Sequence, residues 1–391
     1  MKLFIVMVSI FCLPLSASIK FSDAEINLMH QKYRIDTANV TKNQVVKKLL
    51  EGQYLLEKAK EKQPKLLHTQ SNVGFDTNYH KRRYLYTLLQ PFVDDKLALQ
   101  TLTELPISKE SLKALLGNYP FNGEIDDITK RNLKSEYLVD NEILKLTYFE
   151  LYSSLSMQNR YRLHQGDKQI LLQEVNKRLN FIQVSNYVKP KLKLQSLSYT
   201  TLESIALAEV LRLPMKNYFG VNQMMHSDSL MLNYYEKSVT DEQINNYYAK
   251  NIERFNYLSH VKSKGVYFST QTQAFEFYNA VIKKGWSKTI NHFNVEDIFR
   301  QYHNRLGRNL NSNDWAIQTA FNFPENRTSP PIRTPDGQWL VLNNGDKDYD
   351  VYELNTPTVQ YQAKKQLAKS LAIKNYHQGF QQWLQNQSSN G

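Results

Sequence analysis

The feature that most constrains the fold is a change of residue period within 227–268. Thr240 and Gln243 have the spacing of a capping box, in which each side chain satisfies a free backbone N–H at the start of a helix. Apolar side chains then recur at helical spacing as far as Ile252. Over 261–268 the residues instead alternate with a period of two, which predicts a β-strand. The chain therefore changes here from helical to mixed structure.

The residues before this change are patterned as helices. Ser22 with Glu25, and Thr41 with Gln44, form further capping boxes, and an amphipathic helix follows the second. We predict no strand before residue 250. The other helices predicted here span 108–117, 127–163, 167–187 and 200–213, with Ser108 and Thr200 as caps and with the last two ending before Pro190 and Pro214.

The residues after the change have the pattern of a small α+β module. A strand is followed by two helical segments, a Pro-Asp-Gly turn at 335–337 and a short buried strand at 339–342. The helical segments are predicted at 272–284, where Gly285 ends the helix, and at 291–310. A final amphipathic helix is predicted at 356–386.

The composition is that of a soluble globular chain with excess positive charge. Hydrophobic residues make up 41%, charged residues 22%, and the formal net charge is +12. This charge favours acidic partners such as an anionic membrane surface, or it is simply a solvated basic surface. The densest basic run is His-Lys-Arg-Arg at 80–83, which fits either a short anion site or a solvated helix face, and we favour the solvated face. No nucleic-acid partner is predicted.

Residues 1–18 have the pattern of a secretory signal peptide. Lys2 precedes an apolar run at 3–15, and small residues follow at 16–18. The apolar run is too short to span a bilayer. Cys12 is the only cysteine and lies within this segment, so the exported chain would contain no thiol and no disulfide.

Two stretches resemble the bacterial envelope chaperone–isomerases of the SurA and PpiD type. VTDEQINNYYAKNIERF followed by a strand is similar to the linker helix that enters a parvulin-type domain of these proteins. AFNFPENRTSPPIRTPDGQWLVL is similar to a motif within that domain. The positions that match the motif without a gap are Phe321, Ser329, Pro331, Ile332, Thr334, Gly337, Leu340 and Val341. The resemblance covers 227–385, whereas the first two hundred or so residues match only as a helical envelope chaperone.

The positions of the family's catalytic residues have changed in this chain. Prolyl isomerisation crosses a barrier of about 18–20 kcal/mol, which parvulins lower with an apolar proline pocket and a polar cluster that includes two facing histidines. The resemblance places those histidines at Gly265 and Trp339, and two residues of the proline pocket at Ser312 and Ala316. The family's Gly-Gly-Asp-Leu-Gly run is also absent. We therefore expect a degenerate parvulin-like module with no catalytic residues; an active isomerase is the alternative.

An aromatic cluster in the module is the candidate binding site. We predict that Trp315, Phe321, Phe323 and Trp339 hold an extended apolar segment of an unfolded client polypeptide. The competing interpretation is that these rings form the core of the module. We favour the core role for Phe321 and Trp339, whereas Trp315 and Phe323 fit either the core or the binding role.

No other chemical motif stands out. The chain has no G-x-S-x-G, P-loop or G-x-G-x-x-G sequence, and its nine histidines are scattered. His292 and His303 lack the spacing of a zinc site. We therefore expect neither a metal nor a cofactor.

Together these patterns predict a mostly α-helical protein with one α+β module. The resemblance implies a periplasmic, ATP-independent chaperone that binds unfolded envelope polypeptides. The alternatives are an active peptidyl-prolyl isomerase, a dedicated accessory subunit of an envelope assembly or export system, and a role at a membrane surface. The predicted divisions are a signal peptide (1–18), a helical domain (19–257), a parvulin-like domain (258–352) and a C-terminal helix that packs on the helical domain (353–391).

Overall fold

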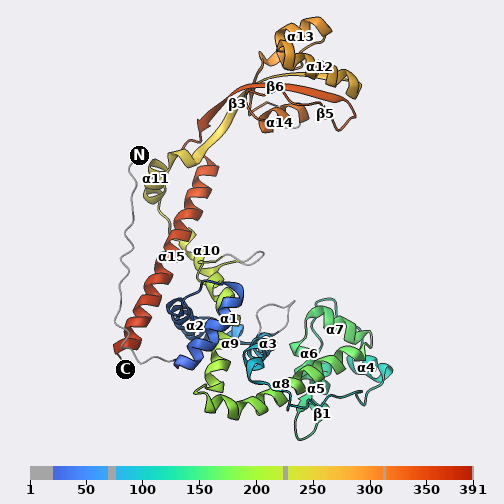
Figure 1. The fold of residues 1–391 in the computed structure, drawn as a ribbon, viewed down its shortest axis with the longest axis vertical. Helices are drawn as coiled ribbons and strands as arrows, with labels where there is room; N and C mark the ends of the chain where they lie inside the picture. The colour runs from blue at the N-terminus through green and yellow to red at the C-terminus, as the bar shows by residue number, and fades with distance from the viewer. Residues whose placement is uncertain (1–20, 69–75, 223–227, 311–313, 390–391) are drawn as a thin grey trace. The chain divides into compact units, whose positions relative to one another are not determined.

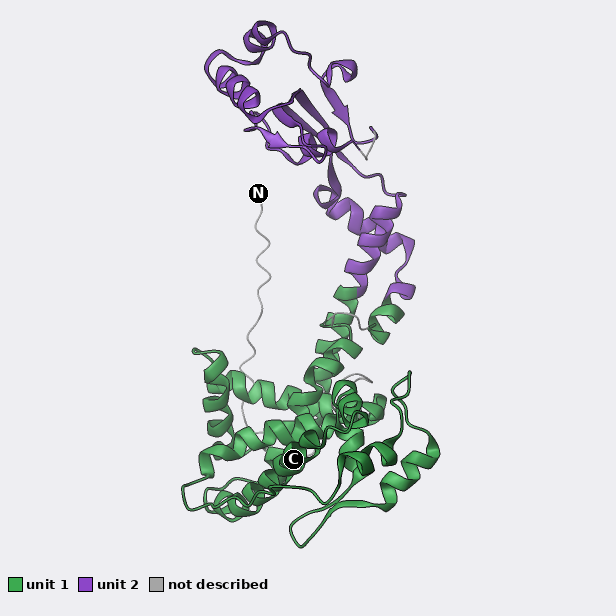
Figure 2. Ribbon diagram, turned by 90° about the vertical axis from the view of Figure 1, so that its right-hand side faces the viewer, with its two compact units in different colours: residues 1–235, 369–391 green, residues 236–368 purple. Residues whose placement is uncertain are grey.

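The chain forms two compact units, which are coloured separately in Figure 2. Unit 1 comprises residues 1–235 and 369–391, and unit 2 comprises residues 236–368. The described part is mostly helical with a small antiparallel sheet, which confirms the predicted fold class. The computed structural model (Figure 1) describes residues 21–68, 76–222, 228–310 and 314–389, so the predicted signal peptide, Cys12 and Ser312 lie outside the described residues.

The helices of the first part of the chain begin at caps that are visible in the sequence. The capping boxes of Ser22 and Thr41 are confirmed, and Ser108 caps a helix that ends at Gly117. Gly117 has a φ of 66°, which glycine adopts without a steric penalty. The helices are α1 (Asp23–Asp36), α2 (Lys42–Lys62), α3 (Thr77–Leu89), α4 (Lys109–Leu116), α5 (Asp127–Ser135), α6 (Tyr148–Ser154), α7 (Met157–His164), α8 (Lys168–Leu194), α9 (Tyr199–Tyr218) and α10 (Leu230–Ser238).

The prediction of one continuous helix over 127–163 was wrong. A hairpin of β1 (Tyr137–Asp140) and β2 (Lys145–Thr147) separates α5 from α6. Asn141 forms the turn, because its Oδ1 accepts hydrogen bonds from the backbone N–H groups two and three residues further on (2.9 and 2.8 Å). Such a local bond competes with helical hydrogen bonding and ends the helix.

Two prolines that were predicted to end helices lie inside them. Pro190 is within α8 and Pro214 is within α9. A proline removes one helical hydrogen bond, but each helix buries an apolar side chain beyond its proline, Leu192 and Met215. Burial of these last turns therefore keeps the helices continuous. The cap of α9 was also misplaced, because the side chain of Ser198 rather than Thr200 receives the first-turn N–H.

Three apolar cores form the described part of unit 1. The first joins α1, α2, α3, α9 and the later half of α8. The second lies between residues 105 and 179 and includes the first half of α8. The third joins α2 and α9 to the end of α15 (Pro357–Ser389). The side chains that α15 contributes to it are Tyr376, Phe380 and Trp383.

Unit 2 is an antiparallel sheet with helices on both faces. The strand order is β4-β3-β6-β5, and each neighbouring pair is antiparallel. The unit begins before the predicted boundary at 258 because α11 is held to the sheet, with the Tyr248 hydroxyl donating to the Tyr352 carbonyl (2.8 Å). Its elements are α11 (Asp241–Lys250), β3 (Asn256–Phe268), α12 (Gln271–Lys284), α13 (Trp286–Phe293), β4 (Arg305–Gly307), α14 (Trp315–Asn322), β5 (Ile332–Arg333) and β6 (Trp339–Val351).

The two long strands extend well beyond the runs predicted at 261–268 and 339–342. They pair along their whole length, from Asn256 opposite Val351 to Phe268 opposite Trp339. Two register shifts interrupt the pairing of the strands, one with an extra residue in β3 and one with an extra residue in β6. The first part of β3 was missed in the sequence because its buried position, Ser259, is polar. The helix predicted over 291–310 was also wrong. His303 and its neighbour have positive φ values of 53° and 58°, and β4 follows them.

The side chains of β6 divide between the two faces of the sheet. Leu340 and Leu342 pack beneath α14, whereas Trp339 and Val341 pack against α12 and α13. This follows from the alternation of side chains along a strand. In the described residues, no helix is both long and apolar enough to cross a membrane.

Candidate functional site

A groove of about 530 Å³ lies beside α14 in unit 2. Its apolar lining comes from Leu258 of β3, Leu310 after β4, and Ile317 and Phe321 of α14. The other lining residues are Gly307, Arg308, Gln318 and Asn322, and they give the groove a mostly polar border. Binding pockets commonly have this volume and this mixture of an apolar lining with a few polar groups.

Both ends of α14 are fixed, which holds the groove in shape. Asp314 caps its first turn, accepting from two backbone N–H groups at 2.9 and 3.1 Å. At the other end, the Asn344 side chain of β6 donates to the carbonyls of Ala320 and Phe323 (2.7 and 3.0 Å). The Lys347 ammonium donates to the carbonyl of the adjacent Phe321 (2.8 Å). The helix is thus tied to β6 by side chains as well as by its buried apolar face.

The structure separates the four predicted binding residues into two groups. Trp315, Phe321 and Phe323 are half-buried beside the core beneath α14, and of these Phe321 lines the groove. Trp339 is half-buried on the opposite face of the sheet, against the core that contains Phe268. The four rings therefore do not form one surface.

Three apolar groove residues were missed in the sequence. Leu258 belongs to the part of β3 that precedes the predicted strand start. Leu310 follows β4, in a segment that was predicted to be helical. Ile317 lies on α14, which was not predicted as a helix. Residues 256–260 show no apolar alternation, because the buried position, Ser259, is polar.

The two positions matched to catalytic histidines do not face each other. A Cβ atom at Gly265 would lie 3.1 Å from Ile298 and Phe299, which belong to the core beneath α14. Trp339 packs on the other face. Side chains at positions 265 and 339 therefore project to opposite sides of the sheet. Ala316, matched to the proline pocket, is buried in the core.

The segment after α13 occupies the space above Gly265. The Gly265 N–H donates to Asp297 Oδ1 (3.0 Å), and its carbonyl accepts from the Ile298 N–H (2.9 Å). Gly265 therefore serves close packing of this segment on the sheet. No space remains there for an imidazole without displacement of Ile298.

Tyr267 of β3 has a hydroxyl with a shifted pKa. Burial raises the pKa of its hydroxyl, and the carboxylates of Asp314 and Asp336 raise it further. The hydroxyl therefore stays protonated at neutral pH and is unsuited to act as a general base. Beside α14, the apolar lining of the groove offers contact to apolar side chains of a ligand.

No protein-family model and no curated protein sequence matches the chain. Solved structures that resemble it include the peptidylprolyl isomerase PrsA of Bacillus anthracis, at 12% identity over 51% of this chain and 81% of that one, with a TM-score of 0.21. A chain from the work on PEB4 and Cj1289, described as SurA-like chaperones of Campylobacter jejuni, is 12% identical over 71% and 98%, with a TM-score of 0.22. The foldase PrsA of Lactococcus lactis is 12% identical over 60% and 89%, with a TM-score of 0.19. TM-scores this low do not establish a shared arrangement over those lengths.

Proposed function

We propose that this protein is a chaperone that holds an extended apolar segment of an unfolded polypeptide in the groove beside α14. The apolar lining formed by the half-buried Leu258, Leu310 and Phe321, together with the buried Ile317, carries the proposal. Accessible apolar surface bordered by polar groups is characteristic of a protein–protein interaction site. The sequence stretches that resemble SurA-type proteins support the same class of function.

Binding of this kind needs no nucleotide. A client segment gains burial of its apolar side chains, and about 25 cal/mol is gained for each Å² of apolar surface removed from water. Ordering the segment opposes this gain, so the net affinity is modest and the segment is released as the client folds. We place this activity in the periplasm, after export directed by residues 1–18, with unfolded envelope polypeptides as clients.

We propose further that unit 2 binds without catalysing prolyl isomerisation. Catalysis by the family's route requires polar groups that converge on one proline, and positions 265 and 339 project to opposite faces of the sheet. Phe321 and the other apolar groove residues supply contacts to apolar side chains, and the polar residues Arg308, Gln318 and Asn322 lie at the border of the groove. A protease-coupled assay on aromatic-Pro peptides tests this point, because a rate that Trp339→Ala abolishes would overturn it.

Suppression of aggregation tests the proposed groove. A denatured outer-membrane protein is diluted into buffer with the chain from Ile19 onward, and light scattering is followed. Gln318→Trp places a large ring in the groove from an exposed position on α14. Gln273→Trp is the matched control, because it adds the same ring at an exposed position on α12, across the sheet.

We expect suppression near a stoichiometric ratio by the unmodified chain and by Gln273→Trp, with a marked loss in Gln318→Trp. Equal suppression by all three would place client binding outside the groove. An absence of suppression by the folded unmodified chain, with folding verified by circular dichroism, would reject the general chaperone. The dedicated accessory subunit would then be favoured, and a pull-down would seek its one stoichiometric partner.

A further inference from the structure

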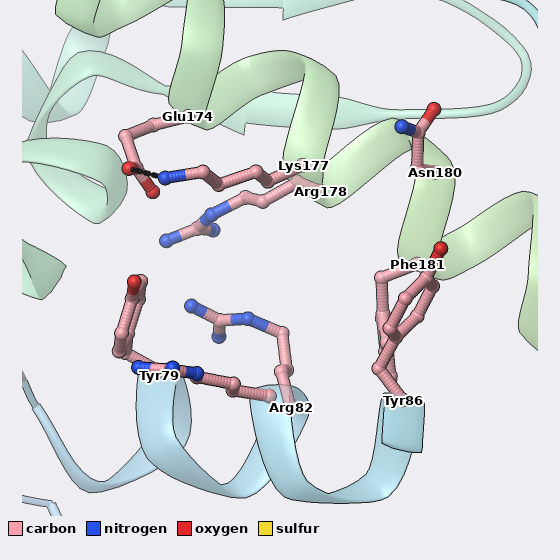
Figure 3. A pocket seen from close by; sticks show the side chains of 9 residues that line it. Tyr79, Arg82, Tyr86, Glu174, Lys177, Arg178, Asn180 and Phe181 are labelled. Carbon is pink, nitrogen blue, oxygen red and sulfur yellow. Dashed lines mark hydrogen bonds and ion pairs between the residues drawn. The ribbon is translucent and has the colours of Figure 1, made fainter. Parts of the chain in front are cut away.

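A pocket of about 500 Å³ in unit 1 lies between α3 and α8 and is independent of the proposed client groove (Figure 3). Four cationic residues line it, Arg82 and Arg83 from α3 and Lys177 and Arg178 from α8. One carboxylate, Glu174, also lines it. The lining therefore carries an excess of positive charge.

Glu174 forms its ion pair with Lys177 and acts on Arg82 and Arg178 through its charge alone. Its Oε1 lies 2.6 Å from the Lys177 ammonium, which is an ion pair within α8. Figure 3 shows the guanidinium groups of Arg82 and Arg178 extending toward each other from the two helices, beside this pair. Two like charges from different helices thus meet across the pocket.

The partners of the two arginines leave hydrogen-bond donors open. Arg178 Nη2 donates to Ser154 Oγ (2.9 Å) and to the Glu150 carbonyl (3.1 Å), which orients its guanidinium without an ion pair. In the part of the chain that the structure describes, the Arg82 guanidinium makes no hydrogen bond and no ion pair within 4 Å. Each guanidinium has five N–H donors, so most of these groups can donate a hydrogen bond to an anionic ligand.

Burial and mutual repulsion oppose the charges of the two arginines, and the nearby carboxylates offset this only in part. Burial and the charge of Arg82 lower the pKa of Arg178 to about 10, and burial lowers the pKa of Arg82, although the carboxylates of Asp76 and Glu174 oppose both shifts. Half-buried like charges repel more strongly than charges in water, because the surrounding dielectric constant is lower. A negative group between them would remove both the repulsion and the unmet hydrogen bonding.

Part of the pocket lining is aromatic. Tyr86 on α3 and Phe181 on α8 both line the pocket (Figure 3). The volume is that of pockets which enclose small organic molecules rather than single ions. A ligand that fills the pocket would therefore have an anionic head and an apolar or aromatic body.

We propose that this pocket binds a small organic anion, with its phosphate or carboxylate between Arg82 and Arg178 and its apolar body against Tyr86 and Phe181. Guanidinium groups recognise both anions through paired N–H donors. The basic run at 80–83 is therefore divided by the fold. Arg83 is exposed, whereas Arg82 is half-buried toward the pocket.

Calorimetric titration of the full chain tests the site with four probes: phenyl phosphate, benzoate, inorganic phosphate and phenol. We expect saturable one-to-one binding of phenyl phosphate or benzoate, and at least tenfold weaker binding of phenol, because phenol lacks the anionic head. Inorganic phosphate should bind more weakly than phenyl phosphate, because it lacks the ring. The preferred anion distinguishes a phosphate ligand from a carboxylate ligand.

Variants locate the binding. Arg82→Gln and Arg178→Gln should each weaken binding of the preferred aryl anion at least tenfold, since each variant loses charge-assisted hydrogen bonds to the anion. Arg131→Gln is the matched control, because Arg131 is exposed on α5 and loses the same charge. Phe181→Ala should weaken the aryl anion while leaving inorganic phosphate unchanged, which provides a test if an arginine variant does not fold.

Two results would overturn the site. One is that the unmodified chain binds phenol as tightly as the aryl anions, or binds none of the probes. The other is aryl-anion affinity that is unchanged in folded Arg82→Gln, Arg178→Gln and Phe181→Ala. Neither result bears on the aggregation assay, which measures the groove in unit 2.

Discussion

The hydroxyl of Tyr376 donates a hydrogen bond of 2.7 Å to Oε1 of Glu51, although the two residues are 325 positions apart. Tyr376 lies on α15 and Glu51 on α2. The Glu51 carboxylate is also 2.6 Å from Arg212 Nη1 and 2.9 Å from the Lys216 ammonium, both on α9. Burial raises the pKa of Glu51, but hydrogen bonds from Tyr376 and Lys216 outweigh it and hold that pKa below its usual value. Three helices are thus joined at one carboxylate.

Removal of the Tyr376 hydroxyl should destabilise unit 1. Tyr376→Phe keeps the ring in its core but takes one hydrogen bond from a half-buried carboxylate, at a cost of about 1–3 kcal/mol. Urea unfolding followed by far-UV circular dichroism measures the loss. Tyr161→Phe is the control, because Tyr161 is exposed and its hydroxyl makes no hydrogen bond within the described ranges. Equal midpoints for the two variants would contradict the role assigned to the Tyr376 hydroxyl.

Arg212 should matter more than any surface arginine. The residue is only 9% exposed, and its side chain binds Glu51, Glu209 and the carbonyl of Lys48. Arg212→Met takes a cationic partner from two partly buried carboxylates, and we expect a loss of about 3–5 kcal/mol in unfolding free energy. Arg162→Met is the matched control, because Arg162 pairs with Asp167 on the surface and such pairs contribute about 0–1 kcal/mol. If urea titrations gave the two variants similar losses of unfolding free energy, the ion pairs of Arg212 would contribute no more than a surface pair.

His164 should make the stability of unit 1 depend on pH below 6.5. Its Nδ1 lies 2.9 Å from the Gly117 carbonyl, which can only accept, so the Nε2 of the neutral ring accepts from the Tyr152 hydroxyl (2.9 Å). Burial lowers the pKa of His164, although the bond to the Gly117 carbonyl opposes this.

The sign of this effect follows from the lowered pKa. The unfolded chain takes up a proton near pH 6.5 and the folded chain only at lower pH, so stability is full above 6.5 and falls as the pH drops toward the folded pKa. The slope from this residue is at most about 1.4 kcal/mol per pH unit. His164→Gln should remove this slope from urea titrations between pH 7 and 5, whereas substitution of the exposed His377 should leave it. If the pH dependence of stability persisted in His164→Gln, it would belong to other titratable groups.

Histidines introduced at positions 265 and 339 should not create an isomerase. Gly265→His places a side chain against Ile298 and Phe299, and such overpacking costs about 1–3 kcal/mol. Combined with Trp339→His, it still directs the two imidazoles to opposite faces of the sheet. We expect a lowered urea midpoint and no turnover of aromatic-Pro peptides. Lys262→His, at an exposed position on the same strand, should leave the midpoint nearly unchanged. Turnover by the double variant would show that the two positions can converge.

The sequence predicted well those features that depend on neighbours along the chain. Ser22, Thr41 and Thr240 begin helices as expected, because a cap needs only its own side chain and the residue three positions later. The turn at Gly337, which has a φ of 91°, is equally local. The overall class followed from the same local signals.

Features that depend on pairing between distant segments were missed. β3 and β6 are long because each pairs with the other, and nothing local to residues 343–351 marks them as a strand. Pro190 stays within α8 because Leu192 is buried by partners from other helices. Tertiary burial outweighed local preference in both cases.

The candidate sites show the same division. Phe321 was identified because aromatic residues on a helix can be recognised alone, whereas Leu258 and Leu310 become groove residues only through the fold. Arg82 was visible as part of a basic run, but its partner Arg178 lies on another helix. The orientation of Arg82 toward the pocket could not be predicted from residues 80–83 alone.

α8 passes from one hydrophobic core of unit 1 into another without a break. Its residues from Ile170 to Leu179 belong to one core, and those from Val184 to Leu192 belong to the other. A flexible connection would let either core open alone, whereas a continuous helix transmits the loss of one core to the turns that support the other. Amide protons in the middle of α8 should therefore exchange with solvent only when both cores open, which makes this helix the slowest-exchanging segment of the unit.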